Sequence, residues 1–144
     1  MQSVRIIEIP ACKMVSSGIG MFGEEKFDRF DAWMSSLPPT MHSKDFLFQE
    51  GEGFHWLCMH DESIDVPAEF DIIDFAGGLY AVTTDIDQKT NIKAMDKEIH
   101  KFLKANGLMQ DESRPRMGNV ISPPLAQKIL GYEQMDYYMP VKAR

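Results

Sequence analysis

The sequence predicts an α+β fold of two pseudo-symmetric β-α-β-β repeats, with a curved antiparallel sheet and two packed helices. The first observation behind this prediction is an internal repeat, since residues 6–11 read IIEIPA and residues 72–77 read IIDFAG. The second is the order of elements after each copy: a continuing strand, one amphipathic helix and two strand-like runs. A match this short arises by chance too, but the shared order favours duplication, with a natural ligand site at the seam between the halves.

The first half begins with a strand, a loop and a helix. Residues 4–15 are rich in β-branched side chains, which favour strands, and Pro10 marks a bulge or an edge. Residues 16–23 are predicted as a Gly/Ser loop. A helix over residues 24–36 follows, because acidic side chains open it and apolar side chains recur at helical spacing. These apolar residues are Phe27, Phe30, Trp33 and Met34.

Two strands and an acidic connection complete the first half. Residues 45–50 and 54–60 are predicted as strands on either side of Gly51-Glu52-Gly53, a sequence typical of a hairpin turn. Residues 61–69 are acidic, contain a proline and join the two halves.

The second half repeats this order. Residues 70–84 are predicted as its long strand, with a bulge at the glycine pair 77–78. Thr90 or Asn91 can cap the next helix, which ends at residues 106–107, Asn-Gly. The apolar face of this helix consists of Ile92, Met95, Ile99, Phe102 and Leu103.

The chain closes with two loops and two strands. A polar loop over residues 110–116 leads to a strand over 117–122. Pro123-Pro124 opens another loop, and residues 134–142 form the closing strand.

Length and composition indicate one domain over residues 1–144, with repeat one at about 4–60 and repeat two at about 70–142. Hydrophobic residues make up 44% of the chain and charged ones 26%, which is ordinary for a folded protein. The formal net charge of −7 argues against direct nucleic-acid binding, which needs a basic surface. The sequence shows neither a signal peptide nor an apolar run of membrane length, so we expect a cytoplasmic protein that does not contact a membrane.

The residues that most often bind metals or act as nucleophiles form no recognisable pattern. Cys12 and Cys58 lack metal-binding spacing and are predicted as reduced, buried strand residues. His55 and His60 are an odd number of positions apart and would face opposite sides of a strand. There is no Walker loop and no nucleophile elbow. We therefore expect no metal, no cofactor and no catalytic residue.

Two short motifs carry a resemblance to a known family. The first is Gly-x-Tyr-Ala on the second long strand, and the second is acidic-x-Tyr-x-Pro on the closing strand. Their residues are Gly78, Tyr80 and Ala81, and Asp136, Tyr138 and Pro140. With these motifs and its element order, essentially the whole chain resembles the gyrase-inhibitor-like effector-binding domains. Such domains occur alone, including integron-associated forms, or fused to the DNA-binding parts of AraC-class and MerR-class transcription regulators.

The resemblance implies the two-repeat fold and an aromatic-lined, hydrophobic pocket between the repeats. In the family, a buried acid often holds cationic, lipophilic ligands in this pocket, and it is frequently a Glu on the strand after the second helix. In this chain that strand, residues 117–121, reads MGNVI and has no acid. The resemblance therefore implies a small-molecule pocket from which the usual route to cation selectivity is missing.

The predicted ligand-binding residues combine aromatic walls with a few polar groups. Aromatic faces attract flat cations, and a buried carboxylate adds charge pairing. Asp136 and Tyr138 share one face of the closing strand, so both can point into one site, whereas Trp33 fits an ordinary core position equally well. The predicted set is Trp33, Trp56, Tyr80, Asn119, Asp136 and Tyr138. Four methionines either line a permissive pocket or, more often, fill core gaps: Met34, Met59, Met95 and Met117.

Two classes of function follow from these residues. The preferred one is a binding module, a sensor or sequestering protein for small lipophilic and in some cases cationic compounds. In transcription regulation it would act through a separate DNA-binding or other protein partner. The alternative is a small-molecule hydrolase in which Trp56 and Tyr138 act with an acid, either Asp136 or Glu8. An acid in that pocket with a pKa raised by burial would favour the enzyme.

Overall fold

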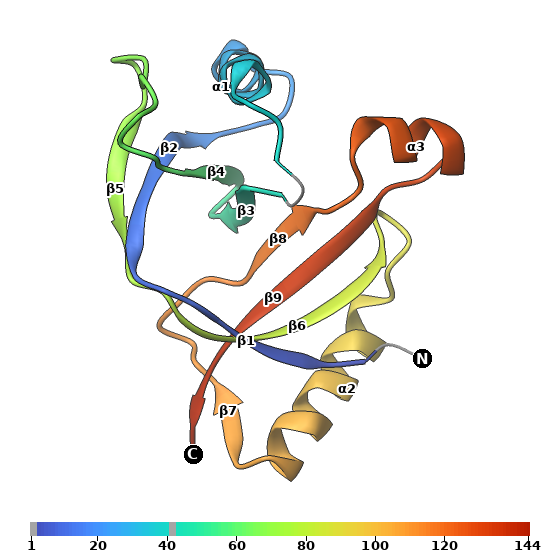
Figure 1. The fold of residues 1–144 in the computed structure, drawn as a ribbon. Coiled ribbons are helices and arrows are strands. Elements are labelled where there is room, and N and C mark those ends of the chain that lie inside the picture. The colour runs from blue at the N-terminus through green and yellow to red at the C-terminus, as the bar shows by residue number, and fades with distance from the viewer. Residues whose placement is uncertain (1–2, 41–42) are drawn as a thin grey trace. The chain divides into compact units, whose positions relative to one another are not determined.

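The computed structural model describes residues 3–40 and 43–144 (Figure 1). The chain forms two compact units. Unit 1 comprises the chain up to Ile9 together with Gly77–Arg144, and unit 2 comprises Pro10–Ala76. In each unit, antiparallel strands form a sheet on which at least one helix packs, so the predicted α+β class is confirmed.

Unit 2 is a four-stranded sheet with one helix, and its strand order is β3-β4-β2-β5. Its elements are β2 (Cys12–Gly20), α1 (Glu25–Ser36), β3 (Asp45–Glu50), β4 (Gly53–Met59) and β5 (Asp71–Phe75). Helix α1 buries Phe30 and Met34 in one cluster with Val15 of β2 and Cys58 of β4. The helix and the β3–β4 hairpin confirm the predicted elements.

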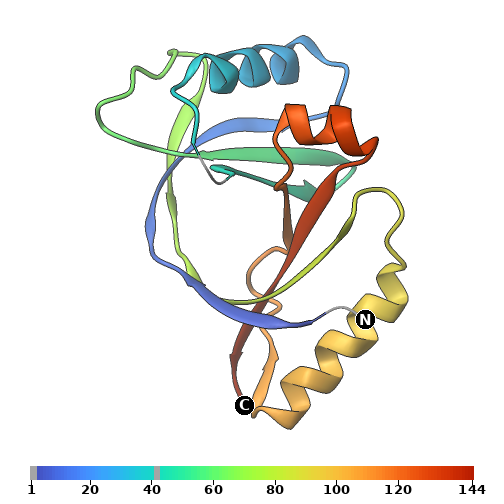
Figure 2. The ribbon, with the colours of Figure 1, turned by 45° about the vertical axis from the view of Figure 1, so that its right-hand side comes forward.

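Unit 1 has the strand order β1-β6-β9-β8, and β7 also pairs with β9. Its elements are β1 (Arg5–Ile9), β6 (Gly78–Ile86), α2 (Ile92–Ala105), β7 (Leu108–Gln110), β8 (Met117–Val120), α3 (Pro124–Leu130) and β9 (Gln134–Ala143). Helix α2 is capped by the side chain of Asn91, which accepts from the Ala94 N–H. Figure 2 shows α2 lying along β6 and β9. It packs on them through Met95, Ile99 and Leu103, which form one core with Ala81, Met139 and Val141.

The strand pairing confirms the internal repeat. The first copy of the repeated segment forms β1 beside β6, and the second copy forms β5 beside β2. The two registers agree. Arg5 of β1 pairs with Val82 of β6, and their counterparts at an offset of 66 positions, Asp71 for Arg5 and Ser16 for Val82, also pair with each other. Both units also place the corresponding strands in the same order, β1-β6-β9-β8 and β5-β2-β4-β3. The repeat is therefore structural and not a coincidence of composition.

Two predicted long strands, residues 4–15 and 70–84, are each divided into two strands. Pro10 separates β1 from β2, because proline has no N–H to donate to a ladder. Gly77 and Gly78, with φ of 69° and 125°, separate β5 from β6 in the second half. At each division the chain passes from one unit to the other, and hydrophobic pattern alone does not reveal such a change of unit.

The predicted loop over residues 16–23 is wrong for its first part, because β2 continues to Gly20. The register of β2 against β4 shifts between Ser16 and Ile19, and Gly18 has a φ of 73°. This bulge accommodates the small residues and lets the strand continue.

The loop predicted after Pro123 is also wrong, because it contains helix α3. The helix begins with a proline, which is tolerated there because N–H groups in the first turn of a helix have no intrahelical acceptor. It ends at Gly131, which has a left-handed φ of 78°. It has no buried side chain, so its sequence lacks the core-facing apolar stripe on which helix prediction depends.

No helix in the described residues combines the length and the apolarity that crossing a membrane requires.

The two cysteines are expected to differ in reactivity. Both thiols are free, Cys58 is fully buried and burial raises its pKa to about 11, whereas Cys12 is half-buried and its pKa is raised less. Since the thiolate is the reactive form, a disulfide reagent should modify only Cys12 in the folded protein and both thiols in denaturant. If Cys58 reacted rapidly in the folded Cys12→Ser variant, this packing would be contradicted.

Candidate functional site

A row of polar residues crosses the sheet of unit 1. Thr84 on β6 and Asn119 on β8 both lie directly opposite Asp136 on β9, so the three side chains are on the same face of the sheet. The alternation along β9 puts Tyr138 on that face as well, while Met139 faces helix α2. Asp136 and Asn119 are 8% and 5% exposed, which is unusual for such polar residues.

Asp136 is held by two partners that the sequence did not suggest. Nη2 of Arg5 lies 3.1 Å from Oδ2 of Asp136, and the Thr84 hydroxyl donates to Oδ1. These are contacts of an ionised carboxylate. Arg5 remains half exposed on its side-chain surface, at 52%, so its charge is only partly withdrawn from water.

Tyr138 stays a neutral phenol beside this carboxylate. Burial raises its pKa to about 12, the negative charge of Asp136 adds to that rise, and a hydrogen bond with Asn119 opposes it. Oδ1 of Asn119 is buried and has no partner among the described residues, so the amide nitrogen makes the bond to Tyr138. The amide oxygen is therefore a buried acceptor that a bound molecule can satisfy.

A pocket of about 140 Å³ lies between helix α2 and strands β8 and β9, on the side of the sheet to which Met139 points, and Tyr138 is among its lining residues. Its lining is mostly apolar, and Nη1 of Arg116 lies 2.7 Å from Oδ1 of Asp96 at its edge. Apolar cavities of about 150 Å³ bind benzene in other proteins, so this pocket has the size of one aromatic ring. The lining residues are Ile92, Met95, Asp96, Ile99, Arg116, Met117, Tyr137, Tyr138 and Met139.

Three of the four methionines singled out in the sequence fill one of the two predicted roles, and the fourth is exposed. Met95 and Met117 line this pocket and are also buried in unit 1. Met34 is a core residue of unit 2, and Met59 is 42% exposed.

Tyr80 serves the structure of unit 1 as well as the aromatic surroundings of Tyr138. Its ring meets that of Tyr138 edge to face at 6.1 Å, and the guanidinium of Arg114 lies 4.7 Å from its centroid. Arg114 also donates to the carbonyls of Gly77, Leu79 and Val141 and pairs with Asp111 at 3.0 Å. The Gly-x-Tyr-Ala motif thus has a physical explanation. Gly78 leaves space for the guanidinium of Arg114, the Tyr80 ring stacks on that guanidinium, and Ala81 packs under α2.

The two predicted tryptophans lie together in unit 2, on the side of its sheet that faces helix α1. Trp56 contacts Phe22, Phe27 and Phe30, and its Nε1 donates to Oδ2 of Asp45 at 2.9 Å. Trp33 packs on Phe30 and Phe70 and donates to the carbonyl of Asp65. The structure therefore brings Tyr80, Asn119, Asp136 and Tyr138 together in unit 1 and the two tryptophans together in unit 2. That all six serve one ligand stays a prediction.

No family model matches the chain, and no curated protein matches it in sequence. Solved structures are similar in fold. The EcmrR C-terminal domain has 9% identity and a TM-score of 0.64, with 100% of this chain and 99% of that one covered. The chain spans 58% of the length of EcmrR as seen in its complex with DNA. A hydrolase from Listeria innocua has 10% identity and a TM-score of 0.65, with 96% and 91% covered.

A third similar structure contains a ligand. SAV2435 bound to tetraphenylphosphonium has 12% identity and a TM-score of 0.51, with 97% of this chain and 94% of that one covered. At identities of this size, a structural likeness establishes a shared fold. The chain therefore has the fold of the EcmrR C-terminal domain, the Listeria hydrolase and SAV2435.

Proposed function

We propose that the protein binds a small, lipophilic, ring-bearing molecule, preferably a cation, and that it serves as an effector-binding module in transcription regulation. Tyr138 and the buried polar row are the centre of the proposed site. The chain would pass the binding signal to a separate DNA-binding or other protein partner. Trp33 and Trp56 stay in the predicted set of ligand-binding residues.

The observation that carries this proposal is a buried polar group with unused hydrogen-bonding capacity in the same unit as an apolar pocket, with Tyr138 next to the first and lining the second. Leaving a buried acceptor such as Oδ1 of Asn119 unpaired costs about 1–3 kcal/mol, which a fold tolerates where function requires it. The adjacent Asp136 carboxylate supplies negative charge, and the pocket accepts an aromatic ring. Few polar groups in an apolar, concave setting are the usual composition of a small-molecule site.

The comparisons support both halves of the proposal. SAV2435, which shares the fold, is bound to tetraphenylphosphonium, a lipophilic cation with four rings. EcmrR, whose C-terminal domain shares the fold, forms a complex with DNA. We infer that this chain corresponds to the ligand-binding part of such a regulator.

The hydrolase alternative is less favoured at this site. It needs a protonated acid near Tyr138, but Asp136 pairs with Arg5 and accepts from Thr84. A carboxylate with these partners suits the binding of positive charge better than the donation of a proton.

Two ions of equal shape and opposite charge test the proposal. Tetraphenylphosphonium and tetraphenylborate have the same four rings, so calorimetric titration separates the effect of charge from that of apolar burial. We expect the phosphonium to bind at least about 10-fold more tightly, a difference of about 1.4 kcal/mol. Equal binding would show a pocket indifferent to charge, and tighter binding of the borate would contradict the proposed role of Asp136.

A further inference from the structure

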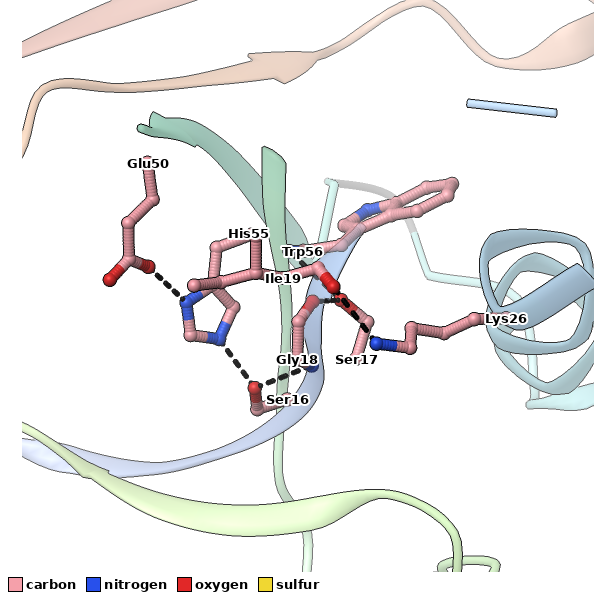
Figure 3. Close-up of polar contacts among 8 residues, drawn as sticks. All are labelled: Ser16, Ser17, Gly18, Ile19, Lys26, Glu50, His55 and Trp56. Carbon is pink, nitrogen blue, oxygen red and sulfur yellow. Dashed lines mark hydrogen bonds and ion pairs between the residues drawn. The ribbon is translucent and has the colours of Figure 1, made fainter. Parts of the chain in front are cut away.

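A second polar cluster lies in unit 2 and shares no residue with the proposed ligand site. Ser16 on β2, His55 on β4 and Glu50 at the end of β3 form a chain of contacts (Figure 3). Nε2 of His55 hydrogen-bonds with the Ser16 hydroxyl, and Nδ1 lies 3.0 Å from Oε2 of Glu50. When the hydroxyl donates to Nε2, Nδ1 carries the ring proton and donates it to the carboxylate. Nucleophile, base and orienting acid stand in this order in serine hydrolases of unrelated folds.

The bulge in β2 supplies a hydrogen-bond donor beside the nucleophile. Where the register against β4 shifts, the Gly18 N–H turns to Oγ of Ser16 at 3.0 Å. A carbonyl attacked by Oγ would place its oxygen within reach of the same N–H, as an oxyanion donor requires. Bulges are concentrated near active sites because they change the direction of a side chain.

Exposure and neighbours define the kind of substrate. Ser16 is 3% exposed, the side chain of His55 is 16% exposed, and that of Glu50 is 49% exposed. Phe48 and Ile19 lie opposite His55 on the two neighbouring strands. The Phe48 ring is 4.9 Å from the imidazole, and Ile19 is 51% exposed. A base that solvent reaches between two apolar side chains favours a small, uncharged acyl group.

We propose that Ser16 is an activated nucleophile for short-chain carboxylic esters, with His55 as general base and Glu50 as positioning residue. Oγ of Ser16 bonds to the ester carbonyl carbon while its proton passes to Nε2 of His55. The carbon–oxygen bond to the alcohol then breaks, and Nε2 returns the proton to the departing oxygen. Water adds its oxygen to the acyl carbon and a proton to Nε2, and Ser16 leaves with that proton as the carboxylic acid is released.

Covalent labelling tests the nucleophile in the unaltered protein. Diisopropyl fluorophosphate should give one adduct by intact mass, and peptide mapping should place it on Ser16. Ser16→Ala should abolish the adduct, and His55→Gln should slow it at least about 100-fold, as expected for loss of a general base. Ser63→Ala is the matched control, because Ser63 is an exposed serine whose hydroxyl donates to a carboxylate, that of Asp61. The Ser63→Ala variant should form the Ser16 adduct at the same rate as the unaltered protein. An unlabelled Ser16 in the folded protein, or a labelling rate indifferent to His55, would overturn the proposal.

Turnover of 4-nitrophenyl acetate tests the positioning residue. Glu50→Gln should lower kcat at least about 10-fold and leave KM unchanged, since the carboxylate acts on the imidazole and not on substrate. Glu52→Gln, an exposed glutamate in the turn of the same hairpin, should change neither constant. Equal constants for the two variants would remove Glu50 from the mechanism. Failure of these tests leaves the ligand-binding proposal standing, because the two sites have no residue in common.

Discussion

Replacing Gly78 with alanine is expected to lower the free energy of unfolding by about 3–5 kcal/mol, combining backbone strain with lost charge-assisted hydrogen bonds. A Cβ at this position would lie 2.5 Å from Nη1 of Arg114, and the backbone φ of 125° is one that L-residues rarely adopt. Arg114 cannot move aside without loss, because it bonds three carbonyls and Asp111 and covers the Tyr80 ring. Chemical denaturation measures the change.

Gly107→Ala is the control for this prediction. Gly107 also has a left-handed φ, 69°, but a Cβ there meets no atom within 4 Å. It should therefore cost only the backbone strain, about 1–2 kcal/mol. If the two variants lose the same stability, the Arg114 guanidinium is displaced freely and does not hold the start of β6.

Changing the charge of the polar row is expected to alter cation affinity in opposite directions. Asp136→Asn should weaken tetraphenylphosphonium by about 1–3 kcal/mol, or roughly 5- to 150-fold, because a charge-assisted contact is lost. Arg5→Gln should tighten it, because the 3.1 Å ion pair that partly neutralises Asp136 is removed. Calorimetry measures both changes.

Two controls isolate the local effect of these charges. Lys13→Gln changes the net charge as much as Arg5→Gln does, but Lys13 is exposed and pairs with Asp74 in unit 2, so it should leave affinity nearly unchanged. Triphenylphosphine oxide, which is neutral, should bind Asp136→Asn almost as well as the parent protein. Equal loss for the cation and the neutral compound would mean that Asp136 supports the fold and not the ligand.

The sequence predicted those parts of the fold that depend on local pattern. Helices α1 and α2, the β3–β4 hairpin and the internal repeat were all readable from periodicity, turn residues and the two copies of one segment. The sequence did not reveal that β1 belongs to the unit of the second half and β5 to the unit of the first half. Pro10 and Gly77 signal an interruption without specifying which strand the next segment pairs with. Helix α3 escaped prediction because it buries no side chain.

The same distinction applies to the sites. Strand alternation placed Asp136 and Tyr138 on one face, and their burial follows from that position. The partners of Asp136, Arg5 and Thr84, are 131 and 52 positions away from it in the sequence. Only the register of three strands brings these residues together. The Ser16–His55–Glu50 contacts depend on a bulge that the sequence presented as a loop. No spacing rule connects a serine and a histidine that meet through such a shift.

The most direct test of the central claim is the crystal structure of the protein with tetraphenylphosphonium. Our account predicts that the cation contacts the Tyr138 side chain, with its charge on the side of the Asp136 carboxylate. A cation bound away from both Asp136 and Tyr138, while these residues keep their contacts with Arg5 and Asn119, would contradict it.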